Sequence, residues 1–405
     1  TTTGGDNTAV GRYSLRYTTT GSSNVAVGYS ALQANTTAGN NTAIGANALQ
    51  ANTTGVSNTA IGAYAGNGIT TASNVVSIGK NSFNSTSTGD NSVAIGNSAC
   101  NVNTSGSALV AVGHNALAAN TTGSHNVAVG YQALDAVTTG GSNVAIGGFA
   151  LTTLEGATTG NTALGHKAGN SCTTGSHNVF VGFKSGEDHT TGYYNTAVGS
   201  ESGNSITTGA NNTALGYKAL TANTTGSQNT AVGKFALTAN TEASYNTSIG
   251  DNSLEANTTG ASNTAVGDQA LSANTTGNNN TAVGKFALTA NTTAAGNVAV
   301  GRDSAIANTT GANLTAIGYY ALKSNTTANH NTAVGNQSLE ANTTGAQNTA
   351  VGKAALETNT TANNNTAIGY AALQLNTTGA GNTAVGRDAL QANTTGTNNT
   401  ALGYE

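Results

Sequence analysis

The chain has 405 residues, of which only 7% are charged, with a formal net charge of −4, and it contains 54 glycines but no Pro, Met or Trp. Disordered chains are rich in charge and Pro, and nucleic-acid-binding proteins carry a basic footprint, so this composition argues against both. No stretch approaches the about 18 consecutive apolar residues of a membrane-spanning helix. We therefore expect no nucleic-acid partner and no membrane segment in this chain.

A single 17-residue repeat organises the whole sequence. A Val, Ile or Leu followed by Gly recurs in 24 copies from Gly11 to Gly403, with a single inserted residue near Leu154. The majority unit is Asn-Thr-Ala-Val-Gly-x-x-Ala-Leu-x-Ala-Asn-Thr-Thr-Gly-x-x. No linker or change of composition divides the chain, so we predict one repetitive domain over residues 1–405, organised as a solenoid of stacked repeats.

Each repeat has the pattern of a short β-strand. Thr or Val stands three residues before the Gly and Val, Ile or Leu one before it, as in Thr8 and Val10. The Ala-Leu segment that follows is too short for a stable helix. We predict two short strands per repeat, closed by Gly and Asn turns. The expected fold is all-β: a parallel β-solenoid of about 24 coils, stacked about 4.8 Å apart.

The alternation of side chains within the first strand predicts an oligomer. We expect the Thr/Val and Val/Ile/Leu positions to face the core, so that the intervening Ala, present in 21 copies, faces outward. Ala is a poor strand former, and an outward row of Ala would let a second chain pack closely. The alternative is a flattened coil in which this Ala relieves crowding.

Two further columns predict local packing. Asn precedes the strand in 20 copies, as in Asn24, and Asn opens the Asn-Thr-Thr-Gly turn, as in Asn35. Stacked Asn side chains can bond amide to amide along a solenoid, although Asn-Thr-Thr also fits the N-glycosylation pattern. In four repeats Gly replaces the Leu while another residue replaces the turn Asn, and we expect the second residue to fill the vacated space. The paired positions are Gly66 with Ile69, Gly169 with Cys172, Gly186 with His189, and Gly203 with Ile206.

The segment Asn91–Gly96, Asn-Ser-Val-Ala-Ile-Gly, resembles the head repeat of YadA-like trimeric autotransporter adhesins, and the other copies look like Thr-for-Ser versions of it. The repeats are also similar to those of phage tail-fibre shafts. The resemblance covers essentially the whole chain. It implies a left-handed parallel β-roll of three identical chains, an extracellular cell-surface or virion location, and a structural or adhesive fibre with an unidentified surface receptor or matrix as its partner.

Two features depart from that family. The repeating coil is longer than the usual head repeat, and no stalk, neck, anchor or fibre-tip domain is present in the sequence. Thr1 and Glu405 both fall within a repeat, so we expect a section of a longer fibre or end-to-end association.

No catalytic constellation is recognisable. The two cysteines, Cys100 and Cys172, match no metal spacing. His114 and His166 share a column three coils apart, which is too far for shared metal ligation. We expect no enzymatic activity, no cofactor and no metal.

The two positions after the repeated Gly carry 10 of the 12 Lys and Arg residues and 13 of the 19 aromatic residues. In a solenoid these positions form one stripe, which is either an exposed corner or a contact surface. The candidate contact residues are Arg12, Tyr13, Tyr131, Lys184, Tyr217, Lys218, Lys234, Phe235, Lys285, Phe286, Tyr319 and Tyr320.

Regular Thr rows raise a different hypothesis, an ice-binding solenoid. Two observations argue against it. The first Thr column is often Val, as in Val25 and Val127, which suits a buried position. In addition, the two adjacent Thr residues of the turn cannot both point outward from one flat strand.

Overall fold

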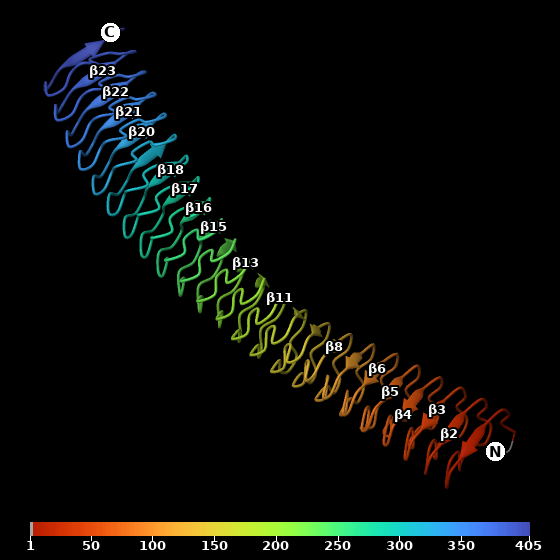
Figure 1. Ribbon diagram of the computed structural model, residues 1–405. Coiled ribbons are helices and arrows are strands. Elements are labelled where there is room, and N and C mark those ends of the chain that lie inside the picture. Colours follow the sequence, from red (N-terminus) through yellow and green to blue (C-terminus); the bar gives the residue numbers. More distant parts are fainter. Residues whose placement is uncertain (1–2) are drawn as a thin grey trace. The chain divides into compact units, whose positions relative to one another are not determined.

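The computed structural model describes residues 3–405, and it confirms an all-β fold built of parallel three-residue strands (Figure 1). The chain divides into two compact units, Thr1–Thr208 and Gly209–Glu405. We call them the N-terminal and the C-terminal unit and describe each by itself. Each unit is a parallel β-solenoid with one strand per coil.

The described part of the N-terminal unit contains twelve strands, which run from red to yellow-green in Figure 1. Their bounds are β1 (Thr8–Val10), β2 (Val25–Val27), β3 (Thr42–Ile44), β4 (Thr59–Ile61), β5 (Val76–Ile78), β6 (Val93–Ile95), β7 (Val110–Val112), β8 (Val127–Val129), β9 (Val144–Ile146), β10 (Thr162–Leu164), β11 (Val179–Val181) and β12 (Thr196–Val198).

The C-terminal unit, all of which is described, also contains twelve strands, which run from green to blue. Their bounds are β13 (Thr213–Leu215), β14 (Thr230–Val232), β15 (Thr247–Ile249), β16 (Thr264–Val266), β17 (Thr281–Val283), β18 (Val298–Val300), β19 (Thr315–Ile317), β20 (Thr332–Val334), β21 (Thr349–Val351), β22 (Thr366–Ile368), β23 (Thr383–Val385) and β24 (Thr400–Leu402).

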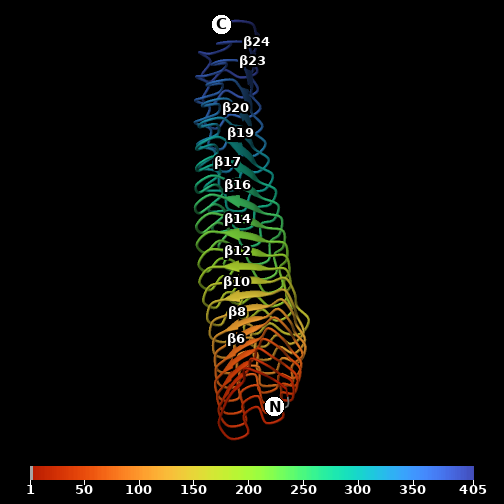
Figure 2. The same cartoon turned by 90° about the vertical axis from the view of Figure 1, so that its right-hand side faces the viewer.

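The pairing register within each unit advances by one repeat per strand. Val25 of β2 pairs with Thr42 of β3, the equivalent residue of the next repeat. Where the sequence carries its inserted residue, Val144 of β9 still pairs with its equivalent, Thr162 of β10, so the turn between them absorbs the insertion. Figure 2 shows the resulting rows of strands within each unit. Equivalent residues of successive coils therefore lie in columns along the solenoid.

The side-chain directions in the strand are the reverse of the expectation. Ala26 and Ala43 are fully buried, whereas Val25 is half-buried and Ile44 is 40% exposed. The central Ala therefore faces the core, and the two flanking columns face solvent. The physical reason is that the alternation of side chains along a strand puts its first and third residues on the same face. It does not determine whether that face or the opposite one is buried. The argument for an oligomer from an outward Ala is therefore wrong.

The Ala-Leu segment is a turn and not the predicted second strand. Leu32 and Leu49 are fully buried there, but each has a φ of 49°. Such a left-handed conformation costs an L-amino acid about 1–2 kcal/mol. The coil tolerates it because Leu32 N donates to Ala48 O of the next coil at 3.0 Å and its side chain fills the core.

Two Asn columns complete the core, as predicted. In the turn column, Asn274 Nδ2 donates to Asn257 Oδ1 at 2.9 Å and to Gly277 O at 3.0 Å. In the column before the strand, Asn58 N donates to Asn41 Oδ1 at 2.9 Å. The turn column therefore bonds amide to amide. In the column before the strand the side-chain oxygen accepts from the backbone of the next coil, and in some coils also from the next amide, as Asn229 Nδ2 donates to Asn212 Oδ1 at 3.2 Å.

The coupled exchange of Leu for Gly also repacks the core. A Cβ atom on Gly66 would lie 3.1 Å from Cδ1 of Ile69, and one on Gly203 would lie 3.1 Å from Cδ1 of Ile206. In these two repeats the residue at the turn position fills the vacated space, as predicted. At Gly169 and Gly186 the prediction is wrong, because the nearest atom belongs to Phe180 and not to Cys172 or His189. Phe180 is the one aromatic residue in the central column of the described strands.

Candidate functional site: an aromatic stripe and an exposed β-face

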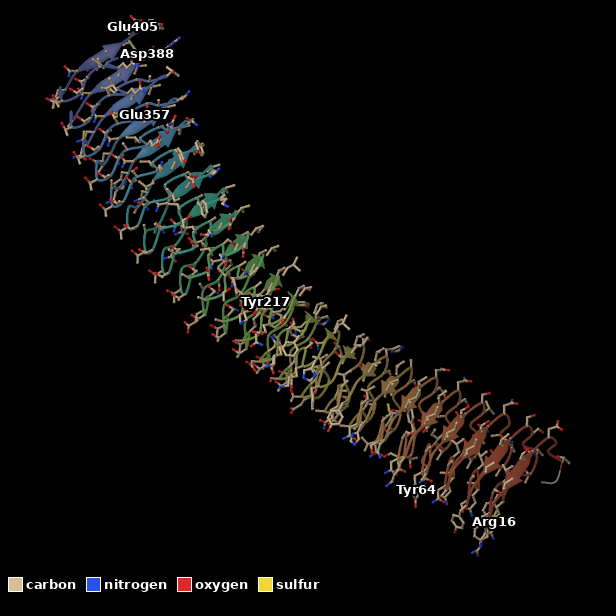
Figure 3. The ribbon with its side chains drawn as sticks, viewed as in Figure 1. Arg16, Tyr64, Tyr217, Glu357, Asp388 and Glu405 are labelled. Carbon is tan, nitrogen blue, oxygen red and sulfur yellow. The ribbon has the colours of Figure 1, made fainter. Side chains whose placement is uncertain are left out.

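All twelve predicted contact residues lie at the corner that follows the repeated Gly, and we call this corner the aromatic stripe. The second stripe position has a positive φ, as in Tyr13 (66°) and Lys184 (55°). Two aromatic residues of the stripe, Tyr64 and Tyr217, are labelled in Figure 3, and each is 42% exposed. The stripe is therefore accessible in the single chain.

Five consecutive coils of the N-terminal unit hold a continuous run of rings. His114 stacks on Tyr131 with centroids 5.4 Å apart, and Tyr131 meets the edge of Phe149 at 5.1 Å. Phe149 contacts His166 at 5.9 Å, and His166 stacks on Phe183 at 6.0 Å. Of these five residues only Tyr131 is among the predicted contacts. The sequence pattern that could have identified the other four residues is the recurrence of rings in the same two columns of five successive repeats.

Cations of the N-terminal unit lie over neighbouring rings. The guanidinium of Arg12 is 4.4 Å from the ring centroid of Tyr13, and Arg12 Nη2 also donates to Tyr13 Oη at 2.5 Å. Lys184 Nζ is 5.7 Å from the ring of Phe183. Such contacts contribute about 0.5–1 kcal/mol at exposed sites.

Carboxylates neutralise part of this positive charge. Glu187 accepts from Lys184 Nζ at 3.0 Å and from Lys167 Nζ at 3.1 Å. Partial burial alone would raise the pKa of Glu187, but the bonds and charges of the two lysines outweigh it, so that the pKa lies below its ordinary value. The carboxylate is therefore ionised at neutral pH.

The C-terminal unit repeats this arrangement in separate short clusters. Tyr217 meets the edge of Phe235 at 5.5 Å, while Lys218 and Lys234 lie 5.4 and 4.9 Å from the rings of Tyr217 and Phe235. The predicted residues are therefore in contact in groups of two to four rather than as one uninterrupted row.

Three further clusters lie in the coils that follow. Lys285 Nζ is 4.7 Å from the ring of Phe286 and 2.9 Å from Asp268 Oδ2. Tyr319 stacks on Tyr320 at 3.8 Å. Arg387, which was not predicted as a contact, lies between Tyr370 and Tyr404 at 5.3 and 5.6 Å.

The second candidate surface is the outward face of the strands. In the N-terminal unit five successive strands, β5–β9, present only aliphatic side chains in both outward columns, and Ile95 and Ile146 are 37% and 39% exposed. We call this surface the aliphatic β-face. It consists of Val76, Ile78, Val93, Ile95, Val110, Val112, Val127, Val129, Val144 and Ile146.

The C-terminal unit presents a different outward face. Thr occupies the first outward column of every strand except β18, and Val, Ile or Leu occupies the second. We call this surface the Thr–Val face. Its hydrophobic row remains accessible, with Val283 at 36% and Ile317 at 38% exposure.

The turn Asn residues are not available for glycosylation in the folded coil. Asn120 and Asn257 are fully buried, and their Nδ2 atoms donate to the carbonyls of Gly123 and Gly260 at 3.0 and 2.9 Å. The Asn-Thr-Thr pattern therefore has a structural explanation.

The buried titratable groups of the described chain include both cysteines. Cys100 and Cys172 are free and buried. Burial raises the pKa of Cys172 to about 12, although a hydrogen bond with the backbone of Gly175 opposes the shift. Among residues 3–405 no three His, Cys, Asp or Glu side chains converge on a metal-sized site. The same residues contain no helix long and apolar enough to cross a membrane.

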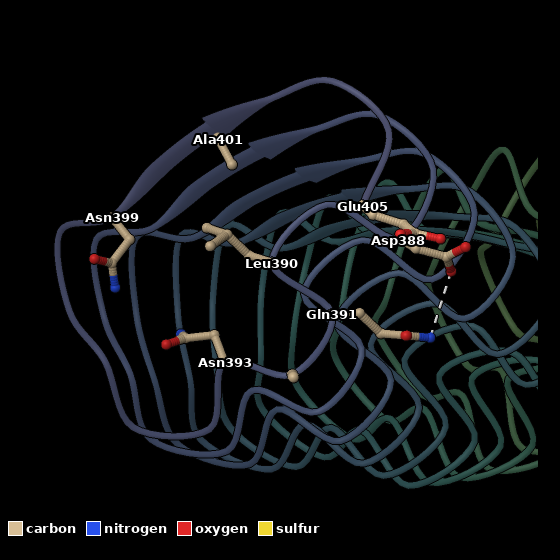
Figure 4. A pocket seen from close by; sticks show the side chains of 8 residues that line it. Asp388, Leu390, Gln391, Asn393, Asn399, Ala401 and Glu405 are labelled. Carbon is tan, nitrogen blue, oxygen red and sulfur yellow. Dashed lines mark hydrogen bonds between the residues drawn. The ribbon is translucent and has the colours of Figure 1, made fainter.

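A hollow lies in the final coil. Leu390, Asn393, Asn399 and Ala401 line it, with Glu405 at its rim (Figure 4). In the earlier coils of this unit, the equivalent residues are covered by the next coil. The hollow is therefore the uncovered core of the last coil.

No protein-family model matches this chain, and no curated protein matches it. The pairing register nevertheless corrects one detail of the resemblance described above. Val93 pairs with Val76, which in turn pairs with Thr59, so Thr corresponds to the Val of Asn-Ser-Val-Ala-Ile-Gly. Ser92 instead takes the Asn position, where its Oγ accepts from Leu109 N at 3.1 Å.

Proposed function

We propose that this chain is a section of an extracellular structural and adhesive fibre, in which identical chains associate through the aliphatic β-face. The observation that carries the proposal is this face itself, with ten aliphatic side chains in two outward columns. The homotrimer and the left-handed winding come from the resemblance to adhesin heads. A phage tail-fibre shaft is the alternative with the same architecture.

Burial of the aliphatic β-face provides a driving force for association. Each buried Å² of apolar surface contributes about 25 cal/mol, and contiguous exposed apolar patches commonly mark interaction sites. In a symmetric assembly of parallel chains the same columns of each copy face one another. The rows of Val and Ile would then stack in register and exclude water.

The aromatic stripe supplies the adhesive part of the proposal. It lies beyond the repeated Gly at the end of each strand, outside the two outward columns, so association through the β-face leaves its rings accessible. Aromatic residues and Arg are enriched at the centres of binding surfaces. The run from His114 to Phe183 is its longest continuous part in the described chain.

Light scattering coupled to gel filtration of the full chain tests the association. We expect the mass of three chains for the natural sequence and of one chain for the double variant Val110→Lys/Val127→Lys, with an unchanged circular dichroism spectrum. Both substituted positions face solvent, so the core of the coil is preserved. The matched control Thr122→Lys changes an exposed turn residue of the same region and should leave the mass unchanged. A single-chain mass of the natural protein at all concentrations would refute the proposal.

A further inference from the structure

The Thr–Val face of the C-terminal unit combines three properties that rarely coincide on one surface. It is regular, because the strands pair in register with equivalent residues opposite each other, as Thr332 pairs with Thr349. It is uncharged, because its columns contain only Thr, Val, Ile and Leu. It is also accessible, with Ile368 at 41% exposure.

Within residues 209–405, all of which the structure describes, the hydroxyls of this face have no protein hydrogen-bond partner, unlike those of the first turn row. In the first of the two turn rows, Thr343 donates from Oγ1 to Thr360 O at 3.0 Å, so the hydroxyls of that row bond to the backbone of the next coil. In the described structure the hydroxyls of Thr332 and Thr349 make no such bond, and both residues are half-buried on the outward side of the strand. The outward Thr column is therefore the row of strand residues whose hydroxyls remain available to water.

This arrangement removes the two objections that the sequence raised against ice binding. The first Thr column was expected to be buried, but it faces solvent. The turn Thr residues need not both point outward, because the rows that matter lie on the strands. From these observations we infer that the Thr–Val face binds ice, with the first layers of ordered water as its ligand.

The spacing and stiffness of the side chains support this ligand. Successive Thr lie about 4.8 Å apart along the solenoid, and the Thr and Val columns lie about 6.6 Å apart across each strand. Both repeats are of the order of the oxygen spacings on the faces of hexagonal ice. Thr and Val are β-branched and restricted at χ1, so little side-chain freedom is lost when a water lattice orders against them.

The same chemistry disfavours an apolar protein partner at this face. Covering a row of hydroxyls with aliphatic side chains would leave each one unsatisfied, which weakens such a complex at every Thr of the row. A charged partner finds no complementary charge in either column. A water lattice instead offers a donor or acceptor to every hydroxyl and fits the methyl groups between its ridges.

The two units differ in this respect, which gives an internal comparison. In the N-terminal unit the first outward column is Val in seven of the twelve described strands, and the aliphatic β-face carries no hydroxyl in that column. The inference goes beyond the proposed fibre function and does not depend on it. It concerns only the face of the C-terminal unit.

Partition of the full chain into a slowly growing ice front is the test, together with inhibition of ice recrystallisation. The natural protein should be enriched in the ice fraction. The variant Thr332→Tyr/Thr349→Tyr should lose this enrichment several-fold, because bulky rings interrupt the face. The matched control Thr344→Tyr places the same ring on an exposed turn residue of the same coils and should retain it. Val298→Thr completes the Thr column and should strengthen the effect.

Circular dichroism of each variant confirms that the solenoid is intact. Exclusion of the natural protein from ice at micromolar concentration, without inhibition of recrystallisation, would overturn the inference. Equal enrichment of Thr332→Tyr/Thr349→Tyr and the natural protein would overturn it as well.

Discussion

A Cβ atom placed on Gly169 would lie 2.7 Å from Cδ2 of Phe180, so the ring of Phe180 occupies the space that a side chain at position 169 would need. Gly186 of the following coil also lies against this ring. Most repeats have Ala at the strand position and Leu at the turn position. Here one aromatic residue and two glycines fill the same volume.

We expect Phe180→Ala to lower the free energy of unfolding of the N-terminal unit by about 3–5 kcal/mol, because it opens a cavity beside two glycines. The variant Phe180→Ala/Gly169→Leu/Gly186→Leu should recover part of the loss. Recovery stays incomplete because each Leu enters a left-handed backbone at a cost of about 1–2 kcal/mol. Urea unfolding followed by circular dichroism measures both effects. An identical midpoint for the single and the triple variant would contradict this packing.

The buried imidazole of His189 makes the N-terminal unit sensitive to acid. His189 Nε2 is 2.9 Å from Gly192 O, and Nδ1 has no hydrogen-bond partner in the described structure. Burial lowers the pKa of His189 below its ordinary value of 6.5, although the carbonyl contact opposes the shift. The unfolded chain therefore binds this proton more readily than the folded chain, and stability falls as the pH drops below 6.5.

We expect the thermal midpoint of this unit to fall between about pH 7.5 and about pH 5, and the fall to be smaller in His189→Asn. Asn suits the position because Asn at this column donates to the carbonyl three residues on, as Asn223 does to Gly226 at 2.9 Å. Scanning calorimetry at a series of pH values measures the difference. Parallel pH profiles for the two proteins would assign the acid sensitivity to other groups.

The turn Asn column should tolerate no loss of donor in the middle of the C-terminal unit. Asn274 donates to Asn257 Oδ1 and Gly277 O, and its own Oδ1 accepts from Asn291 Nδ2 at 2.9 Å. Asn274→Leu leaves these buried partners unsatisfied, at about 1–3 kcal/mol each. Asn274→Asp should be worse at neutral pH, because it buries a carboxylate beside two acceptors.

Urea unfolding of both variants beside Asn336→Leu gives the comparison. Asn336 is an exposed residue directly after Gly335 in the same unit. This control should therefore change the free energy of unfolding by less than about 0.5 kcal/mol. A similar change for Asn274→Leu and the control would show that the column contributes little.

Neither cysteine should react with alkylating agents while the protein is folded. Burial raises the pKa of Cys100 well above its usual range and that of Cys172 to about 12, so the nucleophilic thiolate is scarce. Intact mass after iodoacetamide at mildly alkaline pH should remain unmodified, whereas the urea-unfolded chain should gain two labels. Rapid labelling of the folded chain would indicate local opening of these coils.

The sequence by itself determined the parts of this protein that depend on repetition. A fixed repeat length puts each column in line, so parallel stacking, the two Asn columns and the aromatic stripe all follow from counting. The contact between Ile69 and Gly66 was also predictable, because the two exchanges occur in the same repeat. By contrast, the ring of Phe180 fills space in two coils at once, which a comparison of single repeats does not reveal.

Only the tertiary structure decided which side of the strand faces the core. A strand of three residues can present either side to the core, and the larger β-branched residues were the expected core. The coil is so narrow at this point that it admits a methyl group, with Ala43 fully buried between the outward Thr42 and Ile44. The left-handed turn at Leu49 supplies the bulky core side chain from the opposite side. Which side of the strand faces the core depends on whether its side chains fit the width of the closed coil. That width is defined only once the chain has folded.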